Sequence, residues 1–153
     1  MPNVFRIVKK KYAGTALEGL GAKRYGGRWN SKGTPVVYAS DSIALAALEL
    51  LVHLKRPEIL AHYVILQLGL TDDQVLGLER DALPADWRND PPPPSTAEIG
   101  DEWVDNGASL ALAVPSVIVP EQYNFLLNSE HPNFQAVADQ ATSFPFELDL
   151  RLS

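Results

Sequence analysis

The stretch Arg24–Ser40 constrains the fold and function of this chain more than any other. It begins as a basic, glycine-rich loop, continues into the apolar run 36–39, and ends where Ser40, Asp41 and Ser42 are typical of a helix start. The diglycine at 26–27 allows the backbone to approach an anion, although it fits a tight turn equally well. Arg28 can bind phosphate through paired, charge-assisted hydrogen bonds. The stretch therefore predicts one side of a site for a phosphorylated ligand.

The charges of the chain are unevenly distributed. Residues 1–33 contain eight of the 13 Lys and Arg residues and one acid, a net charge of +7, whereas the remainder has five basic and 18 acidic residues, a net charge of −13. General nucleic-acid binding needs many phosphate contacts, so we expect no direct binding to nucleic acid. The local basic patch fits a small dianion better. The run Lys9–Lys11 is equally compatible with a solvated loop.

The composition indicates one globular domain over residues 1–153. Cysteine is absent, which excludes disulfides and thiolate metal ligands, and the three histidines lie at no metal-ligand spacing. The chain has neither a signal-peptide pattern at its start nor a run of 18 apolar residues. We therefore expect a cytoplasmic protein with no metal and no membrane association.

The periodicity of apolar residues predicts an α+β fold with a mostly antiparallel sheet or a pair of sheets. In the first strand, Phe5 and Ile7 should share one face and Arg6 the other. A turn of helix is expected between residues 13 and 22. Strands are predicted over 4–8, 36–39, 60–68, 108–114, 116–119, 123–127 and 144–152, and helices over 42–54 and 134–140.

The segment 71–107 is acidic and carries no clear period. Its four consecutive prolines, 91–94, favour polyproline II over helix or central strand. The prediction for this segment is an irregular surface loop or a lid.

The helix over 42–54 is apolar nearly all the way round, which indicates burial. Glu49 lies in its narrow polar stripe with Ser42 and His53. Helical geometry alone leaves two options for this carboxylate, a solvent-facing line or a pocket.

Several polar residues interrupt apolar elements and are candidates for chemistry; they are Arg28, Tyr38, Glu49, Ser116 and Asn124. A carboxylate in a partly apolar site can stabilise an oxocarbenium ion or activate a nucleophile. Each residue also has a structural explanation, such as core packing for the tyrosine, a turn for the serine and a local cap for the asparagine. The chain has no Gly-x-x-x-x-Gly-Lys-Ser/Thr loop, no Gly-x-Ser-x-Gly elbow and no dinucleotide-binding fingerprint.

Three blocks of sequence resemble RES-domain proteins. They are Gly26-Gly27-Arg28-Trp29-Asn30-x-x-Gly33-x-Pro35-Val36-Val37-Tyr38-Ala39-Ser40, then Ala47–His53, then Val114-Pro115-Ser116 with Asn124, Asn128 and His131-Pro132. Their order and spacing agree across nearly the whole chain. One departure is Ser129, where the family commonly has proline, and this puts the turn carrying His131 in question.

The resemblance implies a toxin of a type II toxin–antitoxin module, paired with an Xre-type helix-turn-helix antitoxin. It implies an α+β fold similar to ADP-ribosyltransferases, with mostly antiparallel sheets and a few helices around an NAD-binding cleft. Members consume NAD⁺, here a substrate and not a cofactor. The family's catalytic residues carry over to Arg28, Tyr38 and Glu49, which favours the pocket for the glutamate. We expect the substrate-binding residues to be Gly27, Asn30, Ser116 and Asn124.

The leading expectation is cleavage of the nicotinamide–ribose bond by hydrolysis or phosphorolysis. ADP-ribosyl transfer to a cellular protein would use the same site and is the enzymatic alternative. The non-enzymatic alternative is a module that binds a partner and blocks it. A ribonuclease lacks support because basic residues beyond 1–33 are few and no histidines are paired. Self-association as a homodimer within a toxin–antitoxin complex is compatible with the sequence.

Overall fold

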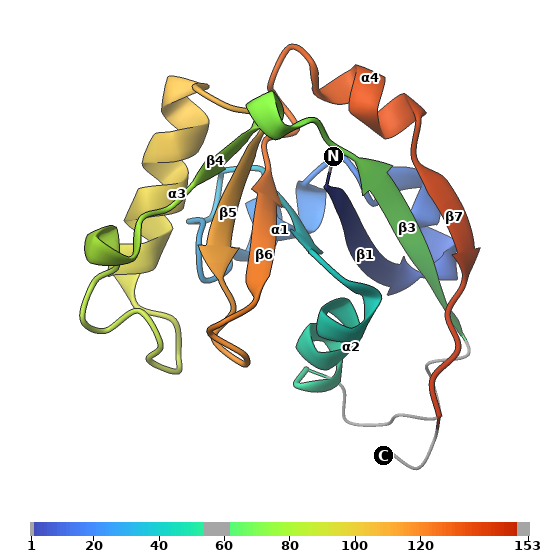
Figure 1. Cartoon of the computed structure of the whole chain (residues 1–153), viewed down its shortest axis with the longest axis horizontal. Coiled ribbons are helices and arrows are strands. Elements are labelled where there is room, and N and C mark those ends of the chain that lie inside the picture. Colours follow the sequence, from blue (N-terminus) through green and yellow to red (C-terminus); the bar gives the residue numbers. More distant parts are fainter. Residues whose placement is uncertain (1, 54–61, 150–153) are drawn as a thin grey trace.

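The computed structural model of the chain describes residues 2–53 and 62–149. Its strands are β1 (Asn3–Lys9), β2 (Val37–Ser40), β3 (Tyr63–Gly69), β4 (Val75–Gly77), β5 (Ala111–Pro115), β6 (Tyr123–Leu127) and β7 (Thr142–Pro145). Its α-helices are α1 (Leu20–Tyr25), α2 (Ile43–Leu51), α3 (Pro94–Asn106) and α4 (Phe134–Asp139), and 3₁₀ helices span Lys10–Thr15, Asp72–Gln74 and Arg80–Ala82 (Figure 1). The predicted α+β class is confirmed.

The strands form one seven-stranded sheet in the order β4-β5-β6-β2-β1-β3-β7. All neighbours are antiparallel except β4 and β5. β1 pairs with β3 along its whole length, but it meets β2 at a single register pair, Phe5↔Ser40. The sheet is therefore almost divided at its centre, between β1 and β2.

Arg6 crosses this division from β1. Its Nη1 donates a hydrogen bond to the carbonyl oxygen of Tyr38 on β2, at 2.8 Å. Burial lowers the pKa of the Arg6 guanidinium, and its Nε has no hydrogen-bond partner within the described residues. Because backbone pairing between the two strands is minimal, this side-chain bond adds a second link between them.

One face of the sheet carries both α2 and α3. Since paired residues project to the same side of a sheet, Phe5 and Ser40 share this face. Ala47 of α2 packs on the β1–β3–β7 half, and Trp103 of α3 packs on the β5–β6 part. The strip of sheet between α2 and α3 includes Tyr38 and Ser40 of β2.

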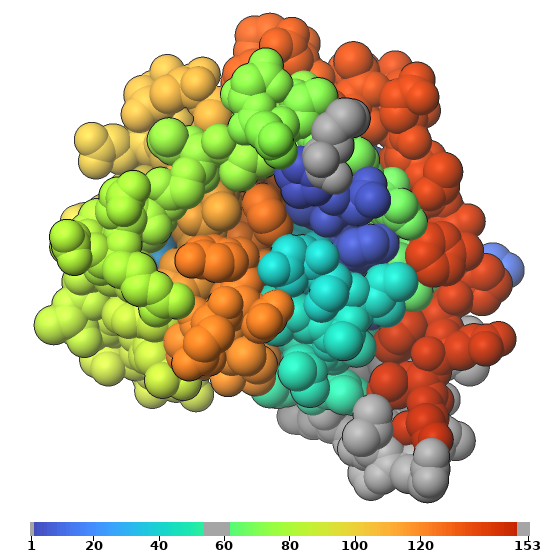
Figure 2. Space-filling view, viewed as in Figure 1, coloured from blue at the N-terminus to red at the C-terminus, as the bar shows by residue number. Residues whose placement is uncertain are grey.

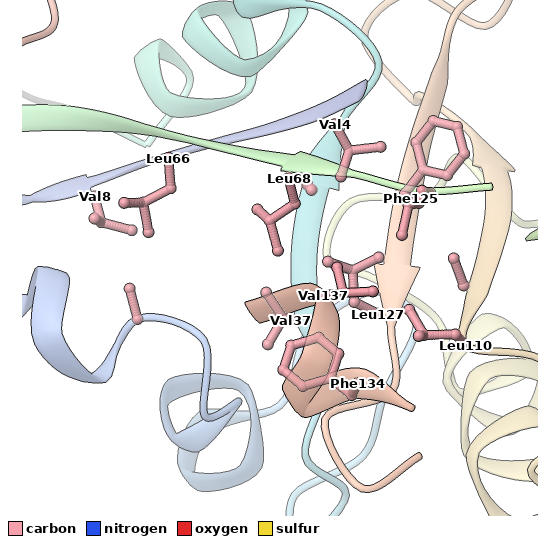
Figure 3. Close-up of a cluster of buried hydrophobic side chains, with 14 residues drawn as sticks. Val4, Val8, Val37, Leu66, Leu68, Leu110, Phe125, Leu127, Phe134 and Val137 are labelled. Carbon is pink, nitrogen blue, oxygen red and sulfur yellow. The ribbon is translucent and has the colours of Figure 1, made fainter. Parts of the chain in front are cut away.

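The opposite face is covered by α4 and the N-terminal 3₁₀ segment. Phe134 and Val137 of α4 join Val37 and Leu127 in the largest apolar cluster (Figure 3). The sheet thus has apolar packing on both sides, and β2 and β6 lie between these packed layers.

The prediction for segment 71–107 was wrong, because most of it is ordered secondary structure. It contains β4 and the thirteen-residue helix α3. Pro94 occupies the first turn of α3, where a backbone N–H would have no acceptor within the helix, so proline is tolerated there. Gly107 ends the helix in the left-handed conformation. The spacing of Ile99, Trp103 and their neighbours is helical, but acidic and proline-rich composition obscured it.

Two strand predictions were also wrong in part. Residues 116–119 form a turn, because the Ser116 hydroxyl accepts the backbone N–H groups of Ile118 and Val119 and so competes with strand pairing. The last strand begins at Thr142 and ends at Pro145, and residues 146–149 are not paired as a strand. Phe144, Phe146 and Leu148 nevertheless share one apolar cluster, as predicted.

The remaining strands and the helices α2 and α4 agree with the predicted ones to within a few residues. In place of one turn of helix between 13 and 22, the structure has a 3₁₀ helix over Lys10–Thr15 and α1 over Leu20–Tyr25. Ser42 caps α2 by accepting the N–H of Leu45, at 3.0 Å. The predicted ends at 54, 60–61 and 150–152 lie outside the described residues. Within the described ranges no helix is long and apolar enough to cross a membrane.

The buried centre of the sheet provides a test of this packing. Leu126 is fully buried, whereas Leu76 on the edge strand β4 is 49% exposed. We expect Leu126→Ala to lower the free energy of unfolding by about 2–5 kcal/mol, and Leu76→Ala, the matched control, by less than about 1 kcal/mol. Urea unfolding followed by circular dichroism measures both. Equal losses would contradict this assignment of the core.

Candidate functional site

The carboxylate of Glu49 is held by two hydrogen bonds to one of its oxygens. Oε1 accepts from the Ser116 hydroxyl at 2.7 Å and from Nδ2 of Asn124 at 2.8 Å. Bonds of this kind are stronger than neutral ones because the acceptor is charged. Oε2 has no hydrogen-bond partner among the described residues. Glu49 therefore points from α2 toward the ends of β5 and β6, with one oxygen available to a ligand.

Both donors are themselves fixed. Ser116 is fully buried, and its oxygen accepts two backbone N–H groups while its proton goes to Glu49. Asn124 accepts from the hydroxyl of Ser40 at 2.7 Å, through Oδ1. If the Asn124 amide were flipped, its Oδ1 would face the Glu49 carboxylate, and two acceptors cannot hydrogen-bond to each other. The observed amide orientation is therefore the one that satisfies both contacts. Ser40 was missed as a site residue, although its spacing of two from Tyr38 places both on one face.

Tyr38 and Asn30 fasten the glycine-rich loop to β2. The Tyr38 hydroxyl donates to Oδ1 of Asn30 at 2.5 Å and accepts the N–H of Trp29 at 3.2 Å. Burial raises the pKa of Tyr38, outweighing the Trp29 N–H and the Arg28 charge, which lower it. Tyr38 is therefore a neutral phenol at physiological pH.

Asn30 was predicted to bind substrate, and the structure places it inside the loop. It is 1% exposed, and its Nδ2 donates to the carbonyl oxygens of Ala22, Thr34 and Ser31 at 2.8, 3.1 and 3.2 Å. Its amide is thus engaged in shaping the loop, and direct contact with a ligand stays a prediction.

Gly27 lies directly against the same pair. A Cβ at this position would be 2.8 Å from Oη of Tyr38 and 2.9 Å from Oδ1 of Asn30. Only glycine allows this approach without displacing the hydroxyl from its partner.

Arg28 connects the loop to the segment before α3. Its Nη1 donates to the carbonyl oxygens of Trp87 and Asn89, at 2.9 and 2.8 Å. Burial lowers the pKa of Arg28, while the charges of Asp90 and Glu49 raise it. Arg28 and Glu49 are therefore close enough for their charges to interact.

The segment 80–90 bridges from the loop to the turn after β5. Arg88 donates to the carbonyl oxygen of Val117 at 2.7 Å, and Arg80 donates to that of Pro120 at 2.5 Å. Figure 2 shows this yellow-green segment against the orange turn, which in turn adjoins the teal residues of α2. Backbone carbonyls carry no residue-type signature, so Trp87 and Asn89 could not be identified from the sequence.

Comparison with known proteins adds an independent line of evidence. The sequence profile of the RES domain matches residues 3–149. A "Toxin Res" from Yersinia enterocolitica is 39% identical over 149 residues, covering 97% of this chain and 98% of the relative. A "Toxin Res" from Photorhabdus laumondii is also 39% identical, with coverages of 97% and 96%. A "Prs ADP-ribosylating toxin" from a Sphingobium species is 35% identical, with coverages of 84% and 81%.

The chain belongs to the RES domain family. The resemblance predicted from the three sequence blocks is thereby confirmed over nearly the whole chain. The residues around Ser129 form a turn, in which the His131 N–H donates to the Asn128 carbonyl oxygen at 3.0 Å. The Ser129 hydroxyl donates to the carbonyl of Glu18 at 3.3 Å. Within the described part of this RES domain, no cluster of His, Cys, Asp or Glu is arranged to hold a metal.

The contact at Gly27 generates a prediction about stability. Gly27→Ala should lower the free energy of unfolding by about 1–3 kcal/mol, because the added methyl separates Tyr38 from Asn30. Gly21→Ala is the matched control, since a Cβ at Gly21 has nothing within 4 Å and the residue lies in α1. Chemical unfolding of both variants measures the difference. A Gly27 variant as stable as the Gly21 variant would contradict the close packing.

Proposed function

We propose that this RES domain is an NAD⁺-consuming toxin that cleaves the nicotinamide–ribose bond. The observation that carries the proposal is the Glu49 carboxylate, held through Oε1 while Oε2 has no partner among the described residues, within electrostatic range of Arg28. The curated relatives named as toxins, one of them as ADP-ribosylating, support this chemistry. Membership of the RES domain family supports an ADP-ribosyltransferase-like fold.

The reaction needs little acid catalysis. The electrons of the C–N bond pass to the nicotinamide nitrogen, which leaves as a neutral molecule from a cationic ring. The difficult species is the ribosyl oxocarbenium ion, and a fixed carboxylate stabilises such developing positive charge. Water then attacks the ribose C1′, its proton is released, and ADP-ribose forms. Glu49 stabilises the cation through the ribose hydroxyls or orients the attacking water. If phosphate attacks in place of water, the reaction is a phosphorolysis.

The other residues have distinct roles in this proposal. Arg28 binds the pyrophosphate through the guanidinium edge that Trp87 and Asn89 leave available. Tyr38 orients the nicotinamide ring. Ser116 and Asn124 act mainly by orienting Glu49, because their polar atoms already bond to it, and Ser116 also lies beside the expected ribose.

The central prediction concerns Glu49. A charge placed well in a water-poor site contributes about 3–4 kcal/mol to lowering a barrier, so Glu49→Ala should reduce NAD⁺ turnover at least about 100-fold with the fold intact. Arg28→Ala should reduce turnover at subsaturating NAD⁺ by a similar factor, mainly through a higher KM, because Arg28 binds the pyrophosphate. Glu98→Ala is the control, because Glu98 is an exposed residue of α3. Nicotinamide release by the purified proteins is the measurement, and folded Glu49 or Arg28 variants with wild-type rates would refute the proposal.

ADP-ribosyl transfer to a protein is the second candidate function. It is favoured by the Sphingobium relative, which is named as an ADP-ribosylating toxin. The same cation would be captured by a protein side chain instead of water. Labelled NAD⁺ incubated with bacterial lysate distinguishes the two, because transfer gives a labelled protein and hydrolysis gives free ADP-ribose.

We also propose a helix-turn-helix antitoxin of the Xre type as the partner that silences this toxin in the cytoplasm. The similarity to "Toxin Res" proteins supports a toxin–antitoxin pairing. The net charge of −13 beyond residue 33 suits a basic, DNA-binding partner.

A further inference from the structure

Helix α3 lies outside the three sequence blocks of the family, yet it contacts the loop that carries Arg28. Thr96, in the first turn of α3, is fully buried, and its hydroxyl is 2.6 Å from the carbonyl oxygen of Arg28. The alternative acceptor, the carbonyl of Pro93, is farther away at 3.2 Å. A hydroxyl has one proton, so the shorter contact identifies Arg28 as its acceptor.

The next turn of α3 contacts the following loop residues. A Cβ at Gly100 would be 1.6 Å from the carbonyl oxygen of Trp29, so the helix backbone itself packs against the loop. Asp101 accepts the N–H of Ser31 at 2.8 Å. Thr96 and Gly100 are one turn apart and face the same side of the helix. The loop backbone at residues 28, 29 and 31 is therefore fixed by one helix.

The same segment also holds the far end of the Arg28 side chain. Nη1 donates to the carbonyls of Trp87 and Asn89, just before α3 begins. Nη2 and Nε of Arg28 have no hydrogen-bond partner within residues 2–53 and 62–149. Residues 87–101 thus hold both the main chain and the guanidinium of Arg28, and they leave one edge of the guanidinium for a ligand.

We infer that Thr96 is a positioning residue for Arg28, which fixes the loop backbone so that the available guanidinium edge meets the pyrophosphate of NAD⁺. This inference rests on the proposed function for the identity of the ligand. An arginine side chain amplifies a small backbone shift at its own Cα, and paired binding of phosphate oxygens requires accurate orientation. Thr96 acts on substrate binding and does not touch the Glu49 carboxylate.

The test compares Thr96→Val, which removes the hydroxyl at nearly constant volume, with Thr96→Ser, which keeps it. Loss of the bond should raise the KM for NAD⁺ about five- to tenfold, with kcat within about twofold of wild type. Thr96→Ser should stay within about threefold of wild type in both parameters. Thr142→Val is the matched control, since Thr142 is exposed on β7 and distant in sequence from the site.

The pattern of the kinetic effects decides the inference. A Thr96→Val variant with unchanged KM, or with a large loss of kcat alone, overturns it. Thr96→Ala provides a second variant if Thr96→Val does not fold, because it removes the same hydroxyl from the Arg28 carbonyl. An unchanged KM in this variant again overturns the inference.

Amide hydrogen exchange measures positioning without any turnover. The N–H of Ser31 should exchange at least about fivefold faster in Thr96→Val, while amides within α2 keep wild-type rates. If wild-type protein fails to consume NAD⁺, the proposed function fails, but exchange at Ser31 still tests the link between α3 and the loop. Unchanged exchange at Ser31 overturns that link.

Discussion

The site depends on the hydrogen bonds that the Glu49 carboxylate accepts from Ser116 and Asn124. Glu49 projects from α2, whose apolar side packs on the β1–β3–β7 half of the sheet, whereas its two donors come from β6 and the end of β5. Because β1 and β2 share only one register pair, these bonds and the Arg6–Tyr38 contact link two halves that backbone pairing holds weakly. The carboxylate proposed for chemistry thus lies where the two halves of the sheet meet.

The two helices on this face have different tasks. α2 supplies the carboxylate, and α3 holds the loop that supplies the guanidinium. Tyr38 lies between them on β2 and fastens the loop through Asn30 and Trp29. In the proposed function, binding is assigned to Arg28 and bond cleavage to Glu49, so substitutions in α3 should affect substrate binding more than the chemical step.

The elements with clear periodicity could be predicted from the sequence, as β1 with its two faces and β6 with its full length illustrate. The convergence of Arg28 and Glu49 followed from the family resemblance, since helix geometry left the direction of Glu49 open. α3 was missed because its proline start and acidic surface hid a helical spacing of buried residues. Ser40, Trp87, Asn89 and Thr96 act through tertiary contacts, mostly to backbone atoms, which residue type and spacing do not reveal.

A crystal structure of the Glu49→Gln variant with NAD⁺ tests the central claim most directly, because glutamine keeps the shape of the site and slows turnover. The account predicts that the nicotinamide ribose lies beside residue 49 and that the pyrophosphate lies against the available edge of Arg28, with Ser116 and Asn124 still directed at the residue 49 side chain. NAD⁺ bound away from residue 49, or a pyrophosphate with no contact to Arg28, would contradict the claim that both residues form one NAD⁺ site.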